Sequence, residues 1–136
     1  MSHKFKRILY TELKNRQQEN YNFQKIAAVL ADYGFAAIRL SDDWCGADFI
    51  AQHIDGLTYL KVQLKGRASF NRKYEGRGIH IAFRSDGCWY IYPHDELLPQ
   101  VLSMANVKGT YSRLGDYTFP QLSRRLRDLL EPYRLE

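Results

Sequence analysis

The sequence contains only two cysteines, Cys45 and Cys88, and they do not form a CxxC pair. Two cysteines are too few for a disulfide framework or a cysteine-based zinc site, so we expect reduced structural thiols. The sequence also lacks an apolar run of roughly 18 residues, the length of a membrane span, and its first residues have no signal-peptide core. We therefore expect a cytoplasmic protein with no membrane partner.

The chain has 136 residues, of which 45% are hydrophobic and 14% aromatic. This is enough for one domain, residues 1–136, to bury its own core. The net charge is +5 and the pI is about 9.2, which favours a polyanionic partner through long-range attraction. Charge alone does not identify that partner, because many small basic proteins have none.

The clearest helical pattern begins after Asn22 and places Phe23, Ile26 and Leu30 on one face. Asn22 is expected to cap this helix, and Gly34 is expected to end it.

Other segments show weaker helical spacing or strand-like alternation, with turn residues between them. Asp55-Gly56 predicts a two-residue hairpin turn, and Ser85-Asp86-Gly87 predicts another hairpin. The order of elements predicts an α/β protein with a central mixed β-sheet flanked by helices. The expected helices are 5–13, which has the weakest pattern, 94–105, which contains Pro99, and 120–133, which has Pro120 in its first turn. The expected strands are 35–40, 47–54, 57–65, 78–84 and 88–93.

The hairpin around Asp55-Gly56 is expected to bring polar residues together at its open end. Counting outward from a two-residue turn places Asp48 directly opposite Gln63 on one face of the sheet. Side chains paired in this way have Cβ atoms about 4.5–5.5 Å apart, and Lys65 returns to the same face two residues later. The other face is an apolar stripe that a helix can cover.

These polar groups suit phosphate chemistry with a divalent cation. Asp48 would be the charged metal ligand and Gln63 a neutral oxygen ligand, while Lys65 would orient a water or stabilise charge on a phosphate. The alternative is that all of them belong to the solvated side of a half-buried strand.

The order of these segments resembles the PD-(D/E)xK nuclease superfamily. The matching features are the helix ending in LADYGF, the strand AAIRL, and GADFIA followed by LKVQLKGR. The branch with Q-x-K in place of E-x-K, which includes group I intron-associated endonucleases, is the most similar. IHIAFRSDGCWYIYPHDEL also resembles the hairpin that follows the core in that branch. The likeness covers roughly residues 5–98 and implies a restriction-endonuclease-like fold, with 99–136 as a helical extension.

The resemblance implies a role for each matching residue. Asp48 corresponds to the metal-binding aspartate, Gln63 to the variable acid and Lys65 to the catalytic lysine. Glu19 is the first candidate for a further metal-binding helix acid and Glu12 the second, although either could be a solvated carboxylate near a helix start. Gln63 is a departure from the usual pattern, because it removes one negative charge from the site.

A basic segment, residues 65–78, follows directly and is a candidate phosphate-contacting loop. Phe70 and Tyr74 lie within it and could stack on unpaired bases. A segment rich in Lys and Arg can also be merely a solvated surface. Its expected nucleic-acid-binding residues are Lys65, Arg67, Arg72, Lys73 and Arg77.

The resemblance therefore implies an endonuclease that uses Mg²⁺, with Mn²⁺ as an alternative, to hydrolyse DNA phosphodiester bonds as a homodimer or homotetramer. Two other functions remain open. One is a nucleic-acid-binding module of the same fold that has lost its metal through Gln63. The other is a protein-interaction subunit with no nucleic-acid role.

Overall fold

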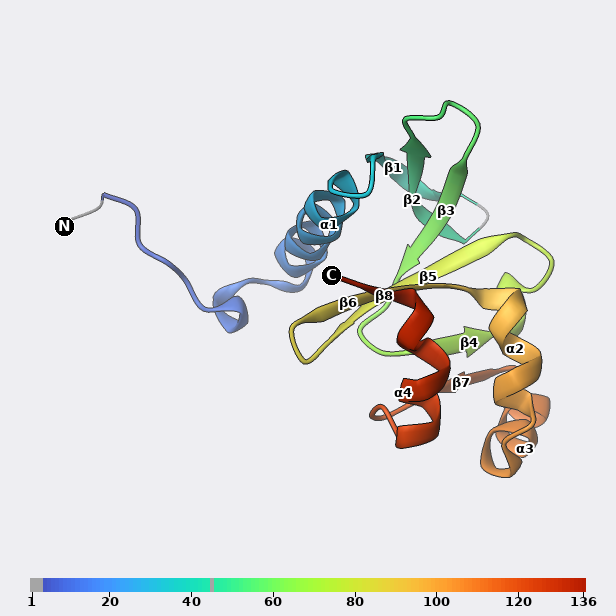
Figure 1. Ribbon diagram of the computed structural model, residues 1–136. Helices are drawn as coiled ribbons and strands as arrows, with labels where there is room; N and C mark the ends of the chain where they lie inside the picture. Colours follow the sequence, from blue (N-terminus) through green and yellow to red (C-terminus); the bar gives the residue numbers. More distant parts are fainter. Residues whose placement is uncertain (1–3, 45) are drawn as a thin grey trace.

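The computed structural model describes residues 4–44 and 46–136, so Cys45 lies outside the described residues. Its centre is a mixed six-stranded sheet with helices on both faces (Figure 1). This confirms the α/β class with a central mixed sheet. Cys88, the other cysteine, is a free, half-buried thiol packed against the core.

The sheet has the order β1-β2-β3-β5-β6-β8, in which β3 and β5 are parallel and all other neighbours antiparallel. A separate two-stranded sheet joins β4 and β7. The strands are β1 (Phe35–Trp44), β2 (Ala47–His53), β3 (Tyr59–Leu64), β4 (Ser69–Asn71), β5 (Ile79–Ser85), β6 (Cys88–Pro93), β7 (Asp116–Thr118) and β8 (Arg134–Leu135). The helices are α1 (Asn15–Ala31), α2 (His94–Leu102), α3 (Ala105–Leu114) and α4 (Arg124–Leu130), with 3-10 turns η1 (Tyr10–Glu12), η2 (Arg72–Tyr74) and η3 (Glu131–Tyr133).

The helix expected to begin after Asn22 begins eight residues earlier, at Asn15, so the prediction of Asn22 as its N-cap was wrong. The Gln17 side chain accepts the backbone N–H of Lys14 at 2.8 Å and thereby closes the first turn. Asn22 instead donates from its side chain to the Tyr10 hydroxyl at 2.9 Å. The weak helix expected over 5–13 is only the short turn η1, and residues 4–9 extend away from the body (Figure 1).

The pairing predicted for the β2–β3 hairpin is confirmed by Phe49, which lies opposite Val62, and by Ala51, which lies opposite Leu60. The predicted two-residue turn was wrong, because the strands end at His53 and Tyr59. Asp55 explains the longer loop, since its carboxylate accepts the backbone N–H groups of Leu57 and Thr58 at 2.8 Å each. Those hydrogen bonds replace a tight turn without shifting the register.

One core lies between α1 and the sheet. Ile26 and Leu30 of α1 pack there against Phe49, Ala51 and Val62, all fully buried or nearly so. The helix therefore covers the apolar stripe expected on the β2–β3 hairpin.

The opposite face of the sheet carries a larger core, and residues after 98 supply a large part of it. Ile81 and Phe83 of β5 pack there with side chains of α2, α3 and α4. Helix α2 continues through Pro99, which is exposed. The C-terminal residues in this core are Val101, Met104, Val107, Tyr111, Phe119, Leu126 and Leu130.

The sequence prediction was least accurate near the C-terminus. Helix α3 was missed, and the closing helix starts at Arg124 instead of Pro120 because the Ser123 hydroxyl caps it. Strands β7 and β8 were also missed, and the loop expected over 41–46 is partly strand, because β1 continues to Trp44. None of the helices in the described ranges is long and apolar enough to cross a membrane.

Candidate active site

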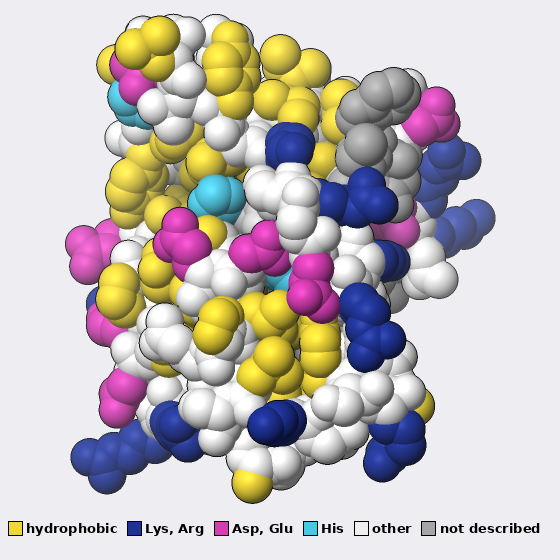
Figure 2. Space-filling model, turned by 90° about the vertical axis from the view of Figure 1, so that its right-hand side faces the viewer, with side chains coloured by type: hydrophobic (Ala, Val, Ile, Leu, Met, Phe, Trp, Pro, Cys, Tyr) yellow, Lys and Arg dark blue, Asp and Glu magenta, His cyan; other side chains and the backbone are white. Residues whose placement is uncertain are grey.

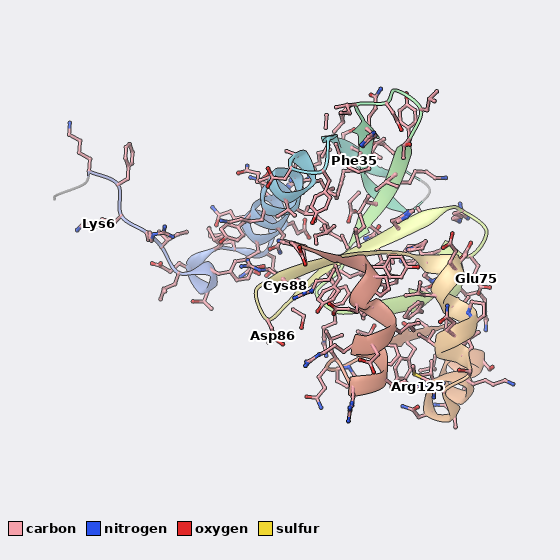
Figure 3. All side chains as sticks on the ribbon, viewed as in Figure 1. Lys6, Phe35, Glu75, Asp86, Cys88 and Arg125 are labelled. Carbon is pink, nitrogen blue, oxygen red and sulfur yellow. The ribbon has the colours of Figure 1, made fainter. Side chains whose placement is uncertain are left out.

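A cleft with a volume of about 1560 Å³ opens between the N-terminal half of α1 and the ends of β1, β2, β3 and the β5–β6 hairpin. In Figure 3 the label Asp86 marks the tip of that hairpin, which also lines the cleft. Four residues predicted from sequence lie on its walls, namely Glu19, Asp48, Gln63 and Lys65. They come from α1, from β2, and from β3 and the residue that follows it, so the folded chain brings them together.

Asp48 lies where β2 and β3 separate. The β2–β3 pairing ends at Phe49 and Val62, and Asp48 and Gln63 are the next residues beyond it. Its Oδ2 accepts the backbone N–H of Leu64 at 2.8 Å, so a side-chain oxygen takes a hydrogen bond that the neighbouring strand would otherwise supply. This bond fixes the orientation of the carboxylate at the cleft.

Gln63 is held differently. Its amide nitrogen makes a long hydrogen bond, 3.4 Å, to the Leu64 carbonyl. Its Oε1 is buried and has no hydrogen-bond partner. Among the buried side-chain polar atoms of the described residues, only His80 Nδ1 is in the same state. An unpaired buried acceptor costs about 1–3 kcal/mol, so such an atom at a cleft calls for an explanation.

Lys65 follows β3 directly, and its backbone N–H donates to the Ala82 carbonyl of β5 at 2.9 Å. Its ammonium lies 5.6 Å from the centre of the buried Tyr74 ring, within cation–π range. Tyr74 also packs closely on Gly46, at which a Cβ atom would lie 3.1 Å from the ring. Gly46 has a φ of +89°, so both space and conformation favour glycine just before β2.

The two helix acids expected from the resemblance have different positions. Glu19 lies in α1 and lines the cleft. Glu12 accepts the backbone N–H of Leu9 at 2.6 Å and closes the turn η1, and it is not among the residues lining the cleft. The structure therefore favours Glu19.

The donor set fits an oxygen-preferring divalent cation, with the carboxylates of Asp48 and Glu19 and the unpaired amide oxygen of Gln63. Across residues 4–44 and 46–136, no three His, Cys, Asp or Glu side chains form a metal-binding group. A cation at this place would therefore depend on the amide oxygen.

The basic segment 65–78 was expected to be a phosphate-contacting loop, but it contains β4 and the turn η2. Phe70 and Tyr74 are buried in the core, so the prediction that they stack on bases was wrong. Phe70 belongs to β4, which pairs with β7, and Tyr74 belongs to the turn η2 that follows β4. Arg72 donates to the carbonyls of Tyr111 and Ser112 at 3.4 and 3.3 Å and so anchors the end of α3.

The remaining charges of this segment are mixed in sign. Arg77 donates to the Lys73 carbonyl at 2.8 Å, and Glu75 accepts the Tyr111 hydroxyl at 2.7 Å. Asp95 of α2 accepts the backbone N–H of Gly76 at 2.9 Å. Figure 2 shows acidic side chains gathered near the middle of the face turned toward the viewer, with Lys and Arg around them.

Sequence reasoning missed several residues that line the cleft. Asp42 was placed in a loop, but it belongs to β1. The three arginines Arg16, Arg39 and Arg84 also line it. They are isolated in the sequence and stand in segments expected to be polar linker or strand, so no local cluster signalled them.

No protein-family model and no curated protein matches this chain. Two solved structures are similar to it. One is Hjc, a Holliday junction resolvase from Archaeoglobus fulgidus, at 20% identity and a TM-score of 0.44, over 56% of this chain and 72% of that one. The other is the bacterial homing endonuclease I-Ssp6803I, at 17% identity and a TM-score of 0.49, over 89% of this chain and 86% of that one. Neither similarity is close enough to place the chain in a family.

Proposed function

We propose that this protein is a metal-dependent endonuclease that hydrolyses DNA phosphodiester bonds, of the PD-(D/E)xK type with a Q-x-K strand. The observation that carries the proposal is the convergence of Asp48, Gln63 and Lys65 on one cleft, with the buried Gln63 Oε1 left unpaired. A solvated strand face would leave this amide exposed to water. Coordination to Mg²⁺ or Mn²⁺, together with Asp48 and Glu19, would satisfy it.

When bound, the cation would supply positive charge that offsets charge on the scissile phosphate and activates water. Asp48 holds its carboxylate in a fixed direction through the Leu64 N–H. The Lys65 ammonium, supported by the Tyr74 ring, stabilises the negative charge that grows as water attacks phosphorus and the bond to the leaving sugar oxygen breaks. The attacking water gives up one proton to the solvent, and the leaving oxygen takes up one.

One observation favours a second candidate function. Gln63 contributes no negative charge, so the same cleft could belong to a nucleic-acid-binding module that needs no metal. Isothermal titration with Mg²⁺ and Mn²⁺ separates the two functions. Saturable binding that weakens in Asp48→Asn supports the enzyme, and absence of binding supports the module.

The decisive experiment is cleavage of supercoiled and linear DNA with Mg²⁺, with Mn²⁺ and with EDTA. Asp48→Asn and Lys65→Ala should each lower the metal-dependent rate by about 10²-fold or more, because each removes charge stabilisation from the reacting phosphate. Asp128→Asn and Lys108→Ala remove matched charges outside the cleft and serve as controls. Cleavage that survives Asp48→Asn, or a wild type that cuts no DNA with either metal, would contradict the proposal.

A single compact site cuts one strand at a time, so we also propose that the enzyme acts as a homodimer or homotetramer. Light scattering of the purified chain measures this directly. A monomer at the concentrations used for cleavage would contradict that part of the proposal alone.

A further inference from the structure

The walls of the cleft carry three arginines from three different elements. Arg16 belongs to the first turn of α1, Arg39 to β1 and Arg84 to β5, and all three line the cleft with Asp48 and Lys65. Within residues 4–44 and 46–136, none of the ion pairs involves any of these arginines. Among the described side chains, no carboxylate therefore forms an ion pair with them.

Arg39 is held in place by neutral groups. Its Nη1 donates to the Asn20 side-chain oxygen at 3.0 Å, and its guanidinium lies 5.5 Å from the centre of the Phe23 ring. Both partners belong to α1, next to Glu19. These contacts fix the position of the cation over the cleft without cancelling its charge.

Arg84 lies on the opposite wall. It stands in β5 two residues after Ala82, whose carbonyl accepts the backbone N–H of Lys65. It is exposed and pairs across the hairpin with Trp89, which also lines the cleft. A phosphate chain that reaches Lys65 from this side therefore passes Arg84.

The basic segment 65–78 is less suited to this task. The Arg72 guanidinium is occupied by carbonyl oxygens of α3, and Arg77 is bonded to the Lys73 carbonyl. Glu75 adds a negative charge in the same segment, and the Asp95 carboxylate accepts the backbone N–H of Gly76 there. The cleft holds acids too, namely Glu19, Asp42, Asp48 and Asp86, but its cations line the same walls as the candidate catalytic groups.

The structure assigns the DNA-backbone contacts to Arg16, Arg39 and Arg84, so that the phosphate chain runs through the cleft between α1 and the β5–β6 hairpin. This inference rests on the proposed function for its choice of DNA as the ligand. It moves the binding surface away from the segment 67–77 that the sequence suggested.

The test is binding of a fluorescent DNA duplex to the full chain in EDTA, measured by anisotropy over a range of salt concentrations. Each phosphate contact contributes about 0.9 to the slope of log K against log salt, which amounts to about eightfold in Kd at 0.1 M salt. Arg39→Ala and Arg84→Ala should each lose about this much slope and affinity. Arg39→Lys and Arg84→Lys keep the charge and should retain most of the slope, which separates electrostatics from misfolding.

Two further variants serve as comparisons. Arg113→Ala, on the exposed end of α3, should leave the slope unchanged, and Arg77→Ala should do the same. If the salt slope falls in Arg67→Ala and Lys73→Ala but not in the Arg39 and Arg84 variants, the assignment is overturned. A wild type that binds no duplex, or that binds an RNA of the same sequence more tightly, overturns it as well.

These outcomes are separate from the fate of the proposed enzyme, because binding in EDTA requires no metal. A chain that binds through Arg39 and Arg84 but cuts no DNA would support this inference and contradict the nuclease. If cleavage depends on Asp48 but the Arg39 and Arg84 variants keep the wild-type salt slope, the nuclease is supported and this inference is contradicted.

Discussion

The hydrogen bond between the Leu64 N–H and Asp48 Oδ2 predicts that two substitutions of one residue will affect stability and activity differently. Asp48→Ala removes the acceptor and leaves a partly buried backbone N–H unpaired. Asp48→Asn removes the charge but keeps an oxygen that can accept the same hydrogen bond. Both variants lose the charged ligand, so both should lose metal-dependent cleavage.

The expected magnitudes follow from the hydrogen bond between Asp48 and the Leu64 N–H. An unpaired buried donor costs about 1–3 kcal/mol, so Asp48→Ala should lower the free energy of unfolding by that amount. A neutral acceptor replaces a charged one in Asp48→Asn, and charge-assisted bonds are roughly twice as strong, so the loss there should be about 0.5–1 kcal/mol.

Urea denaturation measures both changes, and amide hydrogen exchange localises them. The Leu64 amide should exchange faster in Asp48→Ala than in Asp48→Asn, while the Val62 amide, one step inside the β2–β3 pairing, should change less. Asp42→Ala removes another acid from the same cleft and controls for charge. Equal destabilisation of the alanine and asparagine variants, or an unchanged Leu64 amide, would refute the reasoning.

Three other perturbations test separate parts of the structure. Gln63→Glu restores a charged ligand, so calorimetry should show Mg²⁺ binding that is roughly tenfold tighter, about 1.4 kcal/mol. The same substitution should destabilise the metal-free chain, because burial disfavours a carboxylate. Weaker Mg²⁺ binding would contradict the role of Gln63 as a ligand. Tyr92→Phe should lower the free energy of unfolding in urea by about 2–4 kcal/mol, because the buried hydroxyl accepts the Ser69 N–H at 2.9 Å and donates to the Ser69 carbonyl at 2.6 Å. A loss below about 1 kcal/mol, roughly one ordinary hydrogen bond, would argue against both bonds. Hydrogen bonds from Thr58 and Leu57 hold the pKa of Asp55 well below its ordinary 3.8, so this carboxylate stabilises the folded state above that pH and loses its effect on acidification. The difference in urea midpoint between wild type and Asp55→Ala should accordingly shrink as pH falls from 7 to 3, and a constant difference would rule out this contribution.

The part of the fold that was predicted correctly follows from alternation over short distances. Phe49 and Ala51 are buried while Ile50 between them is less so, and Val62 is the buried residue of β3, so the apolar pattern determined the pairing of Phe49 with Val62. The turn was mispredicted because the hydrogen bonds of the Asp55 side chain leave no trace in hydrophobic periodicity. The register survived because the apolar face permits only one alignment.

The mistakes about the binding surface arose from contacts between distant residues. Sequence showed the charges of Arg72 and its neighbours but not the carbonyls of Tyr111 and Ser112, about 40 residues later, that bind it. In the same way, Arg39 and Arg84 are isolated basic residues in two separate strands and come to line the same cleft as Lys65 only when the sheet forms. Local composition therefore pointed to a basic segment, while the fold collected cations from three separate elements.

The parallel pairing of β3 with β5 also has a consequence for how the chain folds. Antiparallel neighbours such as β2–β3 and β5–β6 need only short connections, whereas a parallel pair requires a longer crossover and forms more slowly. Asp48 and Gln63 can face each other as soon as the first hairpin closes. Arg84 joins them only after the crossover is complete, so the arginine side of the cleft depends on a long-range strand pairing that the acid and the amide do not need.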